Sequence, residues 1–276
     1  MSVHTVRTRL GPMVYEATGS GPPLVLLHAN GHDRRDFDAV VPALSAAHTT
    51  LAFDWPGMGE SPAPLDPRSV TAAKMADVLE DVVDELRLPP SVFVGNSIGG
   101  FASLRLAARR PHAVRALVPV DPGGFTARSV VSRSFCWLKG HEWFTQRTIR
   151  AFTAHVLKRR NWQVETILRR VVASHRRPAT VAVDAAIWRS FPRPDSSLQG
   201  EAPRVTCPTM LVWGKQDPVL RAQVEGAAAR RALPGARWVE LDTGHAPFAE
   251  DPAGFLGAVL PFLQALPWSY PADRAA

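Results

Sequence analysis

The amino-acid sequence predicts a doubly wound α/β fold with a mostly parallel sheet and a helical insertion. Short apolar runs alternate with helical patterns along most of the chain, as expected when crossover helices join parallel strands. A serine framed by glycines stands between one such run and the helical pattern that follows it. Between about residues 125 and 195 the alternation stops, and only helical patterns remain.

Six short apolar runs predict strands. Most of them are continuous rather than alternating, which is typical of parallel strands covered on both faces. Ahead of these runs, residues 3–9 and 13–17 are joined across Gly11-Pro12 and predict an antiparallel hairpin. The six predicted strands are residues 24–27, 49–53, 91–94, 116–120, 209–213 and 238–241.

Helical patterns fall between the predicted strands. Apolar residues between Met75 and Leu86 recur at three- and four-residue spacing, which predicts an amphipathic helix. A second pattern runs from Gly99 to Arg110 and stops before a proline, and a third lies around residues 255–263. Because strands and helices alternate, we expect ligands to bind at the carboxyl ends of the strands.

The predicted insertion covers residues 125–195 and leaves an α/β core formed by residues 1–124 and 196–276. Two helical stripes, Ile149–Leu157 and Val164–Val172, lie within it. We therefore expect the insertion to be a helical cap on the core.

The positive charge of the chain is concentrated in this insertion. The formal net charge is +7, yet residues 126–195 hold 14 Lys and Arg against 4 Asp and Glu, so the remainder of the chain is slightly acidic. Such a region could attract anionic substrates, or it could consist of solvated helix faces. Nucleic-acid binding is a poor fit because no recognised binding module accompanies the charge.

The composition favours a soluble protein with one large domain. A chain of 276 residues with 46% hydrophobic residues can bury a full core. Its two cysteines cannot form a disulfide framework, and the first ten residues lack the apolar stretch of a secretory signal. No run is long enough to span a membrane. We expect a cytoplasmic protein that acts on a small molecule; its oligomeric state is not predicted.

Gly95-Asn96-Ser97-Ile98-Gly99 is the strongest indication of function. It places a serine in a G-x-S-x-G frame between the strand pattern of residues 91–94 and a helical pattern. A sharp strand-to-helix turn would expose Ser97 as a nucleophile, and glycines on either side would leave room for the turn. The backbone N–H of Ile98 would lie at the helix N-terminus, where it can receive a developing oxyanion.

A serine nucleophile needs a base and a group that orients the base. His245 follows the predicted strand at residues 238–241, which makes it the best candidate for the base. Asp217 follows the preceding strand and is the leading candidate for the acid, because the order Ser, Asp, His is that of nucleophile-elbow enzymes. Asp121, which also ends a predicted strand, is a competing candidate.

Together these motifs resemble the α/β-hydrolase fold family, and the resemblance extends over essentially the whole chain. It implies a catalytic triad of Ser97, His245 and Asp217 and a cap domain over the active site. The motifs that carry it, in chain order, are HANG at residues 28–31, DWPGMGES at 54–61, GNSIG at 95–99, GKQD at 214–217 and GH at 244–245.

The resemblance also implies an oxyanion hole formed by the backbone N–H groups of Asn30 and Ile98. The family usually has His-Gly where this chain has His28-Ala29, a change that removes no donor. The side chain of Asn30 could donate as well.

We expect neither a cofactor nor a metal. The glycine-rich loop from Asp54 to Ser61 lacks the spacing of a phosphate-binding loop and is interpreted as a structural turn near the active site. No cluster of His, Cys, Asp and Glu has the spacing of a metal site.

The expected reaction is hydrolysis of a carboxylic ester, thioester or lactone through an acyl-enzyme. Ser97 argues against the haloalkane dehalogenases and epoxide hydrolases of the family, which use an aspartate nucleophile. The elbow is also similar to that of serine-type C–C bond hydrolases, and cofactor-free perhydrolases share the triad. A hydrolase-like binding protein without turnover is the alternative outside enzymes.

Substrate specificity would depend on the cap. Its large aromatic residues could line an apolar acyl pocket, but their helical spacing favours the core of the cap for most of them. They are Trp137, Trp143, Phe144, Phe152, Trp162 and Trp188.

Overall fold

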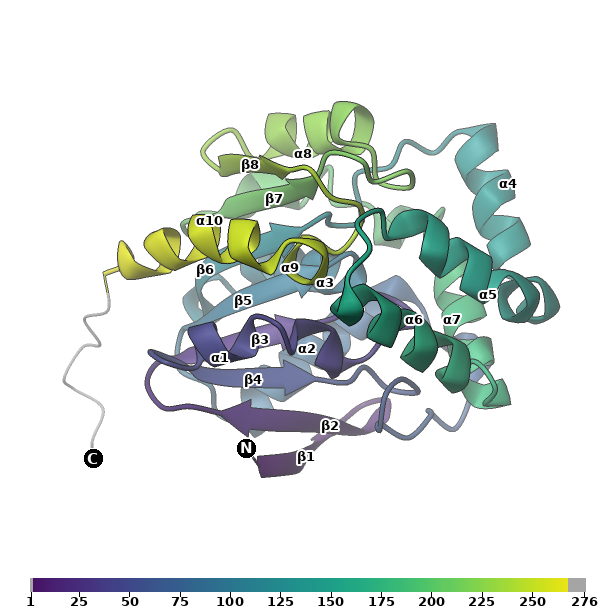
Figure 1. The fold of residues 1–276 in the computed structure, drawn as a ribbon, viewed down its shortest axis with the longest axis horizontal. Helices are drawn as coiled ribbons and strands as arrows, with labels where there is room; N and C mark the ends of the chain where they lie inside the picture. The colour runs from purple at the N-terminus through teal and green to yellow at the C-terminus, as the bar shows by residue number, and fades with distance from the viewer. Residues whose placement is uncertain (1, 268–276) are drawn as a thin grey trace.

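The computed structural model describes residues 2–267, and its centre is an eight-stranded sheet (Figure 1). The strand order is β1-β2-β4-β3-β5-β6-β7-β8; β2 pairs antiparallel with β1 and β4, and the remaining pairs are parallel. This confirms the predicted hairpin and the mostly parallel sheet. The strands are β1 (Ser2–Thr8), β2 (Gly11–Thr18), β3 (Pro23–Leu27), β4 (Thr49–Phe53), β5 (Ser91–Asn96), β6 (Val114–Val120), β7 (Met210–Gly214) and β8 (Arg237–Leu241).

Helices cover both faces of the sheet (Figure 1). This is why the strand runs are continuously apolar: in β3, Leu24 and Leu26 pack into one hydrophobic cluster, and Val25 and Leu27 pack into the other. One face is covered by α2 (Ala72–Glu85), α3 (Ile98–Arg109) and α8 (Ala227–Ala232), and the other by α1 (Val41–Leu44), α9 (Pro247–Glu250) and α10 (Pro252–Gln264).

The helix predicted from Met75 to Leu86 is α2. Thr71 caps it, since its side chain accepts a hydrogen bond from the backbone N–H of Lys74 at 3.1 Å. The apolar stripe is buried against the sheet, and Leu86 is the residue at which the helix ends. Here the sequence period alone predicts both the helix and the face that it buries.

Four α-helices lie between β6 and β7, beyond the carboxyl ends of the parallel strands (Figure 1). Two of them, α5 and α6, contain the predicted stripes. The boundaries 125–195 remain a prediction, although the four helices fall within them. They are α4 (Val130–Lys139), α5 (Glu142–Val156), α6 (Trp162–Ser174) and α7 (Pro178–Ser190).

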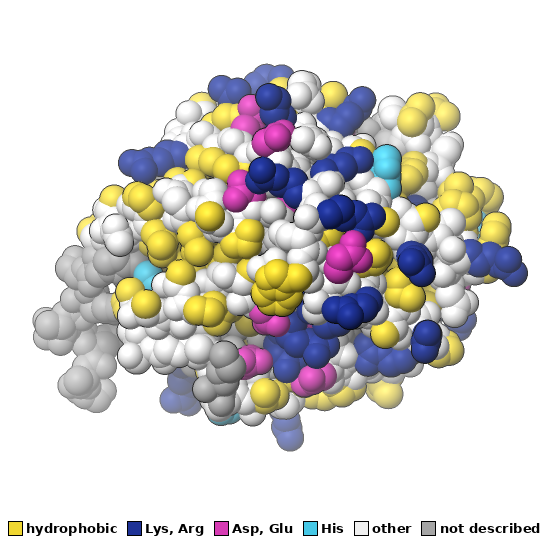
Figure 2. Space-filling view, in the orientation of Figure 1, with side chains coloured by type: hydrophobic (Ala, Val, Ile, Leu, Met, Phe, Trp, Pro, Cys, Tyr) yellow, Lys and Arg dark blue, Asp and Glu magenta, His cyan; other side chains and the backbone are white. Residues whose placement is uncertain are grey.

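Basic side chains are gathered over these helices. Figure 2 shows Lys and Arg side chains concentrated over the half of the visible face where α5 and α6 lie in Figure 1. Exposed arginines there include Arg150, Arg159, Arg160 and Arg169. Among the residues that the structure describes, no helix is both long and apolar enough to cross a membrane.

Candidate active site

Ser97 occupies a strained turn between β5 and α3. Its φ and ψ angles are 55° and −110°, a backbone conformation that non-glycine residues rarely adopt. The neighbouring glycines are required by the close approach of other backbone segments, because a Cβ at Gly95 would collide with the carbonyl of Gly99, and one at Gly99 with the carbonyl of Leu27. The structure therefore has the geometry that the G-x-S-x-G pattern predicts for a nucleophile elbow.

The strained turn is held in place by hydrogen bonds. Ser97 N–H donates to the carbonyl of Val120 at the end of β6, over 3.0 Å, and the carbonyl of Ser97 accepts from the N–H groups of Phe101 and Gly123. Because neighbouring elements fix the backbone on both sides, the serine keeps a conformation that would otherwise be costly.

His245 is paired with Asp217. Its Nδ1 lies 2.6 Å from Asp217 Oδ2, and Asp217 is 3% exposed. The other carboxylate oxygen of Asp217 accepts from the backbone N–H groups of Val219 and Leu220, at 2.8 and 3.0 Å. These bonds orient the carboxylate, so that the imidazole keeps its proton on Nδ1 and leaves Nε2 without one.

Asp121, the competing acid, does not bond to His245. Its Oδ1 accepts from the backbone N–H of Gly214 at 2.9 Å, and its Oδ2 is buried without a hydrogen-bond partner among the described residues. Burial, together with the nearby carboxylate of Asp217, raises the pKa of Asp121 well above its ordinary value. Asp121 is thus a buried carboxyl group next to the His–Asp pair, and its surroundings favour the protonated form.

Asp121, Asp217 and His245 are also the one group of described residues whose ligand atoms lie close enough together to hold a metal ion, within 4.8 Å of one another. The hydrogen bond between His245 and Asp217 and the amide donors on both aspartates already account for this proximity.

Two residues that sequence reasoning missed hold the histidine loop. Asn96 Nδ2 donates to the carbonyl of His245 at 2.9 Å, which ties this loop to the residue before Ser97. Glu250, buried at the end of α9, accepts from the backbone N–H groups of Gly244 and Ala246 and also from those of Lys158 and Arg159. The sequence signal for Glu250 was an acidic residue in the short apolar stretch that follows Gly244-His245.

The two predicted oxyanion donors flank the elbow. The backbone N–H groups of Asn30 and Ile98 have no acceptor among residues 2–267, so both are free to bind a ligand oxygen. The side chain of Asn30 is engaged elsewhere: Nδ2 donates to Asp184 Oδ1 on α7 at 2.5 Å. Its amide group therefore anchors the loop to α7, and only the backbone N–H fits the predicted role.

Ser97, His245 and Asn30 line one cavity of about 690 Å³ between the carboxyl edge of the sheet and the inserted helices α4, α5 and α7. Its helical wall is largely apolar and aromatic, which suits an organic substrate rather than a solvated ion. Phe135, Phe152, Trp188 and Phe191 form this wall.

The expectation for the aromatic residues holds for only part of the set. Phe152 and Trp188 line the cavity, and their rings meet edge to face at 5.7 Å. Trp137, Trp143 and Trp162 are at least 60% exposed, so the interpretation that most of these residues form the core of the cap is wrong for them. They lie on the solvent side of their helices.

The motifs at His28 and Asp54 are structural. His28 is buried, its Nδ1 donates to the carbonyl of Ala29 at 2.7 Å, and its Nε2 accepts from the N–H of Trp55 at 3.1 Å. Asp54 accepts from the backbone and guanidinium of Arg34 and from the N–H of Glu60, which closes the glycine-rich loop. This agrees with the interpretation of residues 54–61 as a turn.

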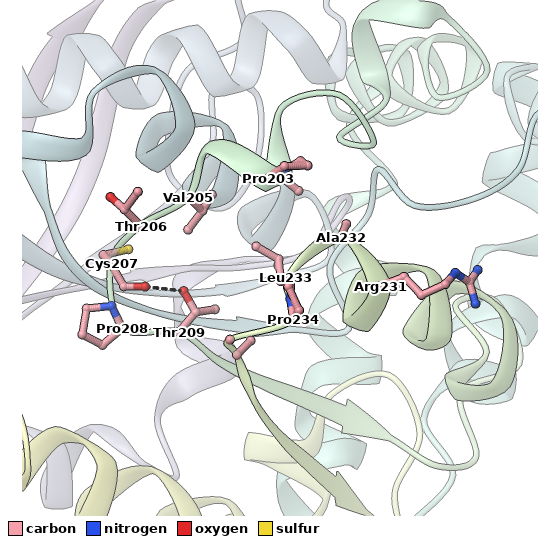
Figure 3. Close-up of a pocket in the computed structure, with 13 residues that line it drawn as sticks. Pro203, Val205, Thr206, Cys207, Pro208, Thr209, Arg231, Ala232, Leu233 and Pro234 are labelled. Carbon is pink, nitrogen blue, oxygen red and sulfur yellow. Dashed lines mark hydrogen bonds between the residues drawn. The ribbon is translucent and has the colours of Figure 1, made fainter.

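A second cavity, of about 570 Å³, lies at the opposite edge of the sheet (Figure 3). Residues that precede β7, among them Val205 and Cys207, face Leu233 and Pro234 from the loop before β8. Burial raises the pKa of the Cys207 thiol, which makes it a weak nucleophile. This cavity lies at the amino ends of the strands and lacks the serine, histidine and aspartate of the first.

The chain belongs to the alpha/beta hydrolase family, whose model matches residues 24–258. Over 270 residues it is 28% identical to the pimeloyl-[acyl-carrier protein] methyl ester esterase of Nitrosomonas europaea, covering 87% of this chain and 95% of that relative. It is also 28% identical over 251 residues to a protein of Pseudomonas savastanoi pv. phaseolicola named as a carbamate hydrolase, covering 88% and 94%.

Solved structures share the fold. A thermophilic esterase from Thermogutta terrifontis superposes with a TM-score of 0.82 at 23% identity, covering 96% of this chain and 99% of that one. The enol-lactonase from Burkholderia xenovorans LB400 superposes with a TM-score of 0.79 at 22% identity, covering 95% and 100%. At these identities the likeness bears on the fold alone.

Proposed function

We propose that the protein is a serine hydrolase that cleaves a carboxylic ester, thioester or lactone of a small molecule through an acyl-enzyme on Ser97. One observation carries this proposal: Ser97, on a strained elbow, shares an apolar cavity with a histidine that is hydrogen-bonded to a buried aspartate. The names of the relatives, an ester esterase and a carbamate hydrolase, support the same class of reaction.

In this mechanism His245 Nε2 takes the proton of Ser97 as the serine oxygen attacks the substrate carbonyl. The oxyanion that forms is stabilised by the backbone N–H groups of Asn30 and Ile98. The protonated His245 then gives its proton to the leaving group, and the C–O or C–S bond breaks. Water, deprotonated by the same histidine, attacks the acyl-enzyme. The bond between the acyl carbon and the Ser97 oxygen then breaks as His245 returns the proton to that oxygen, and the acid is released. Asp217 stabilises the imidazolium at both stages.

We propose that residues 125–195 act as a cap domain over this cavity and that the protein works in the cytoplasm. The cap interpretation is supported by Phe152 and Trp188, which come from two inserted helices and line the cavity that contains the serine. Substitution of these two aromatic residues should therefore alter the preference for the carbon skeleton of the substrate more than the rate of the chemical step.

A fluorophosphonate probe and a panel of p-nitrophenyl esters of increasing chain length would test this function, with Ser97→Ala beside the wild type. Labelling and hydrolysis that disappear in the variant would support the proposal. Labelling without ester turnover would favour C–C bond hydrolysis or peracid formation. A folded wild type with neither labelling nor turnover would refute the mechanism and favour a hydrolase-like binding protein.

A further inference from the structure

A second histidine–aspartate pair lies in the cavity that contains Ser97. His32, on the loop after β3, lines this cavity, and its Nδ1 lies 2.5 Å from Asp36 Oδ2. The His32 side chain is 10% exposed and that of Asp36 is 2% exposed, so the pair is shielded from bulk solvent. His32 is not part of the predicted triad or of the predicted oxyanion hole.

The geometry determines which nitrogen of His32 faces a partner. The carboxylate of Asp36 can only accept, so Nδ1 carries the proton of that bond. Among residues 2–267, Nε2 has no hydrogen-bond partner, which leaves it for a ligand in the cavity. The imidazole of His32 therefore makes one hydrogen bond, through Nδ1, and when it is protonated its Nε2–H can donate to a ligand in the cavity.

The surroundings of His32 favour its protonated form. Arg170 on α6 donates to Asp36 Oδ1 at 2.7 Å and to Asp33 Oδ2 at 3.0 Å, which holds both carboxylates beside the ring. Burial lowers the pKa of His32, but the carboxylates of Asp36 and Asp33 outweigh it, and the net pKa is raised above the ordinary value.

Among the groups on other elements packed against this loop, the guanidinium of Arg170 opposes that charge and lowers the pKa of His32. The other charged groups that these elements bring are already paired: the carboxylate of Asp54 after β4 with Arg34, and that of Glu250 on α9 with backbone N–H groups. The two aspartates that bind Arg170 outweigh its effect on the ring, and the net pKa of His32 stays raised.

The other charged residues that line the cavity are mostly positively charged. Three arginines line it, against one glutamate. Burial raises the pKa of that glutamate, Glu225, whose carboxylate also accepts from the backbone N–H of Arg221 at 2.9 Å. The arginines are Arg128, Arg193 and Arg221.

We propose that His32 is a specificity-determining residue whose Nε2–H binds a carboxylate of the substrate, so that the preferred esters are anionic. This inference rests on the proposed serine hydrolase function. The apolar wall takes the carbon skeleton of the substrate, His32 takes its carboxylate, and the ester carbonyl lies at Ser97. A hydrogen bond between two charged groups strengthens binding by about tenfold or more.

The test compares two matched ester pairs in wild type and His32→Gln. One pair places the charge on the acyl group: mono-p-nitrophenyl adipate against p-nitrophenyl hexanoate. The other places it on the leaving group: 4-acetoxybenzoate against its methyl ester. Glutamine carries an amide donor near the position of Nε2 but no charge, so that it cannot form the charged hydrogen bond. His155→Gln, which changes another histidine of the cavity wall, is the matched control.

The readout is the ratio of kcat/KM for the anionic ester to kcat/KM for the neutral ester. Ionisation of His245 changes both values by the same factor, so its effect cancels in the ratio. In at least one pair we expect this ratio to fall about tenfold in His32→Gln and to stay unchanged in His155→Gln. In wild type the ratio should decline as pH rises through the raised pKa of His32, and in His32→Gln that decline should be absent. A ratio unaffected by His32→Gln in both pairs would overturn the inference.

A binding measurement keeps the inference separate from the proposed function. Calorimetric titration of Ser97→Ala with adipate and with benzoate needs no turnover. Weaker binding of either anion when His32→Gln is added would support the carboxylate site even in a protein without esterase activity. Equal binding by both proteins, alongside an esterase that depends on Ser97, would refute the site and leave the proposed function intact.

Discussion

Two histidine–aspartate pairs approach the same cavity from opposite sides, and they differ in how their charges are held. The His245–Asp217 pair follows the last two strands, and its carboxylate is bound by backbone amides. The His32–Asp36 pair lies within one loop, and its carboxylate is bound by the guanidinium of Arg170 from an inserted helix.

This difference indicates different roles. A base must exchange protons during each catalytic cycle, so fixed amide dipoles that orient its carboxylate serve it well. A residue that recognises an anion must instead keep its proton, and His32 has two aspartates beside it that favour this state. The cavity therefore contains one histidine suited to proton transfer and one suited to carrying charge.

The largest expected effect comes from breaking the first pair. Asp217→Asn should lower kcat for a neutral ester on the order of 10⁴-fold, because the imidazole loses the partner that sets its tautomer. Steady-state kinetics with p-nitrophenyl butyrate would measure it. A loss smaller than tenfold, with a large loss in Asp121→Asn instead, would show that Asp121 is the catalytic acid.

Glu250→Gln should destabilise the loop that carries His245. The Glu250 carboxylate accepts from four backbone N–H groups, and a glutamine amide would direct its own N–H groups at some of them. We expect the free energy of unfolding to fall by about 1–3 kcal/mol, as when buried donors lose their acceptor. Urea unfolding would measure it, with Glu240→Gln on the partly exposed strand β8 as a control. Equal stabilities of the two variants would contradict this role.

Breaking the second pair should have a smaller and more selective effect. Asp36→Asn removes a negative charge that raises the pKa of His32, so the preference for anionic over neutral esters should drop several-fold near pH 7. The kcat for neutral esters should fall far less than in Asp217→Asn. Kinetics on the same matched esters would check this, and comparable losses on both ester types would indicate a purely structural role for the pair.

The smallest expected effect is on the pH dependence of stability. The pKa of Asp121 is raised, so between about pH 4 and this raised value the folded chain keeps a proton that the unfolded chain has lost. Its contribution to stability therefore decreases as pH rises. Asp121→Asn removes this dependence, so the variant should gain stability relative to wild type from pH 4.5 to pH 8. Parallel urea-unfolding curves across that range would argue against a protonated Asp121.

The first pair was predictable from the sequence because its residues follow strand ends. Continuous apolar runs locate the strands, and parallel strands bring Ser97, Asp217 and His245 to one edge. The choice between Asp217 and Asp121 needed the structure, since both end neighbouring strands. Local patterns thus predict which side chains gather, and three-dimensional packing decides which of them bond.

The second pair was not predictable, because its features depend on contacts across the chain. Arg170 lies more than 130 residues from Asp36, and no local period relates them. Helix α7 was missed for a related reason: it is buried on nearly all sides, so its small and apolar residues show no polar face. The exposed tryptophans were misjudged because helical spacing alone does not reveal which face packs.

The most direct test of the central claim is to measure, by mass spectrometry, whether Ser97 carries an acyl group during turnover. The enzyme would be quenched with acid while it hydrolyses p-nitrophenyl butyrate, digested, and examined by mass spectrometry. The account predicts that the peptide containing Ser97 gains the mass of one butyryl group and that Ser97→Ala gains none. Turnover by wild type with no acyl group on Ser97, or with the acyl group on another residue, would contradict it.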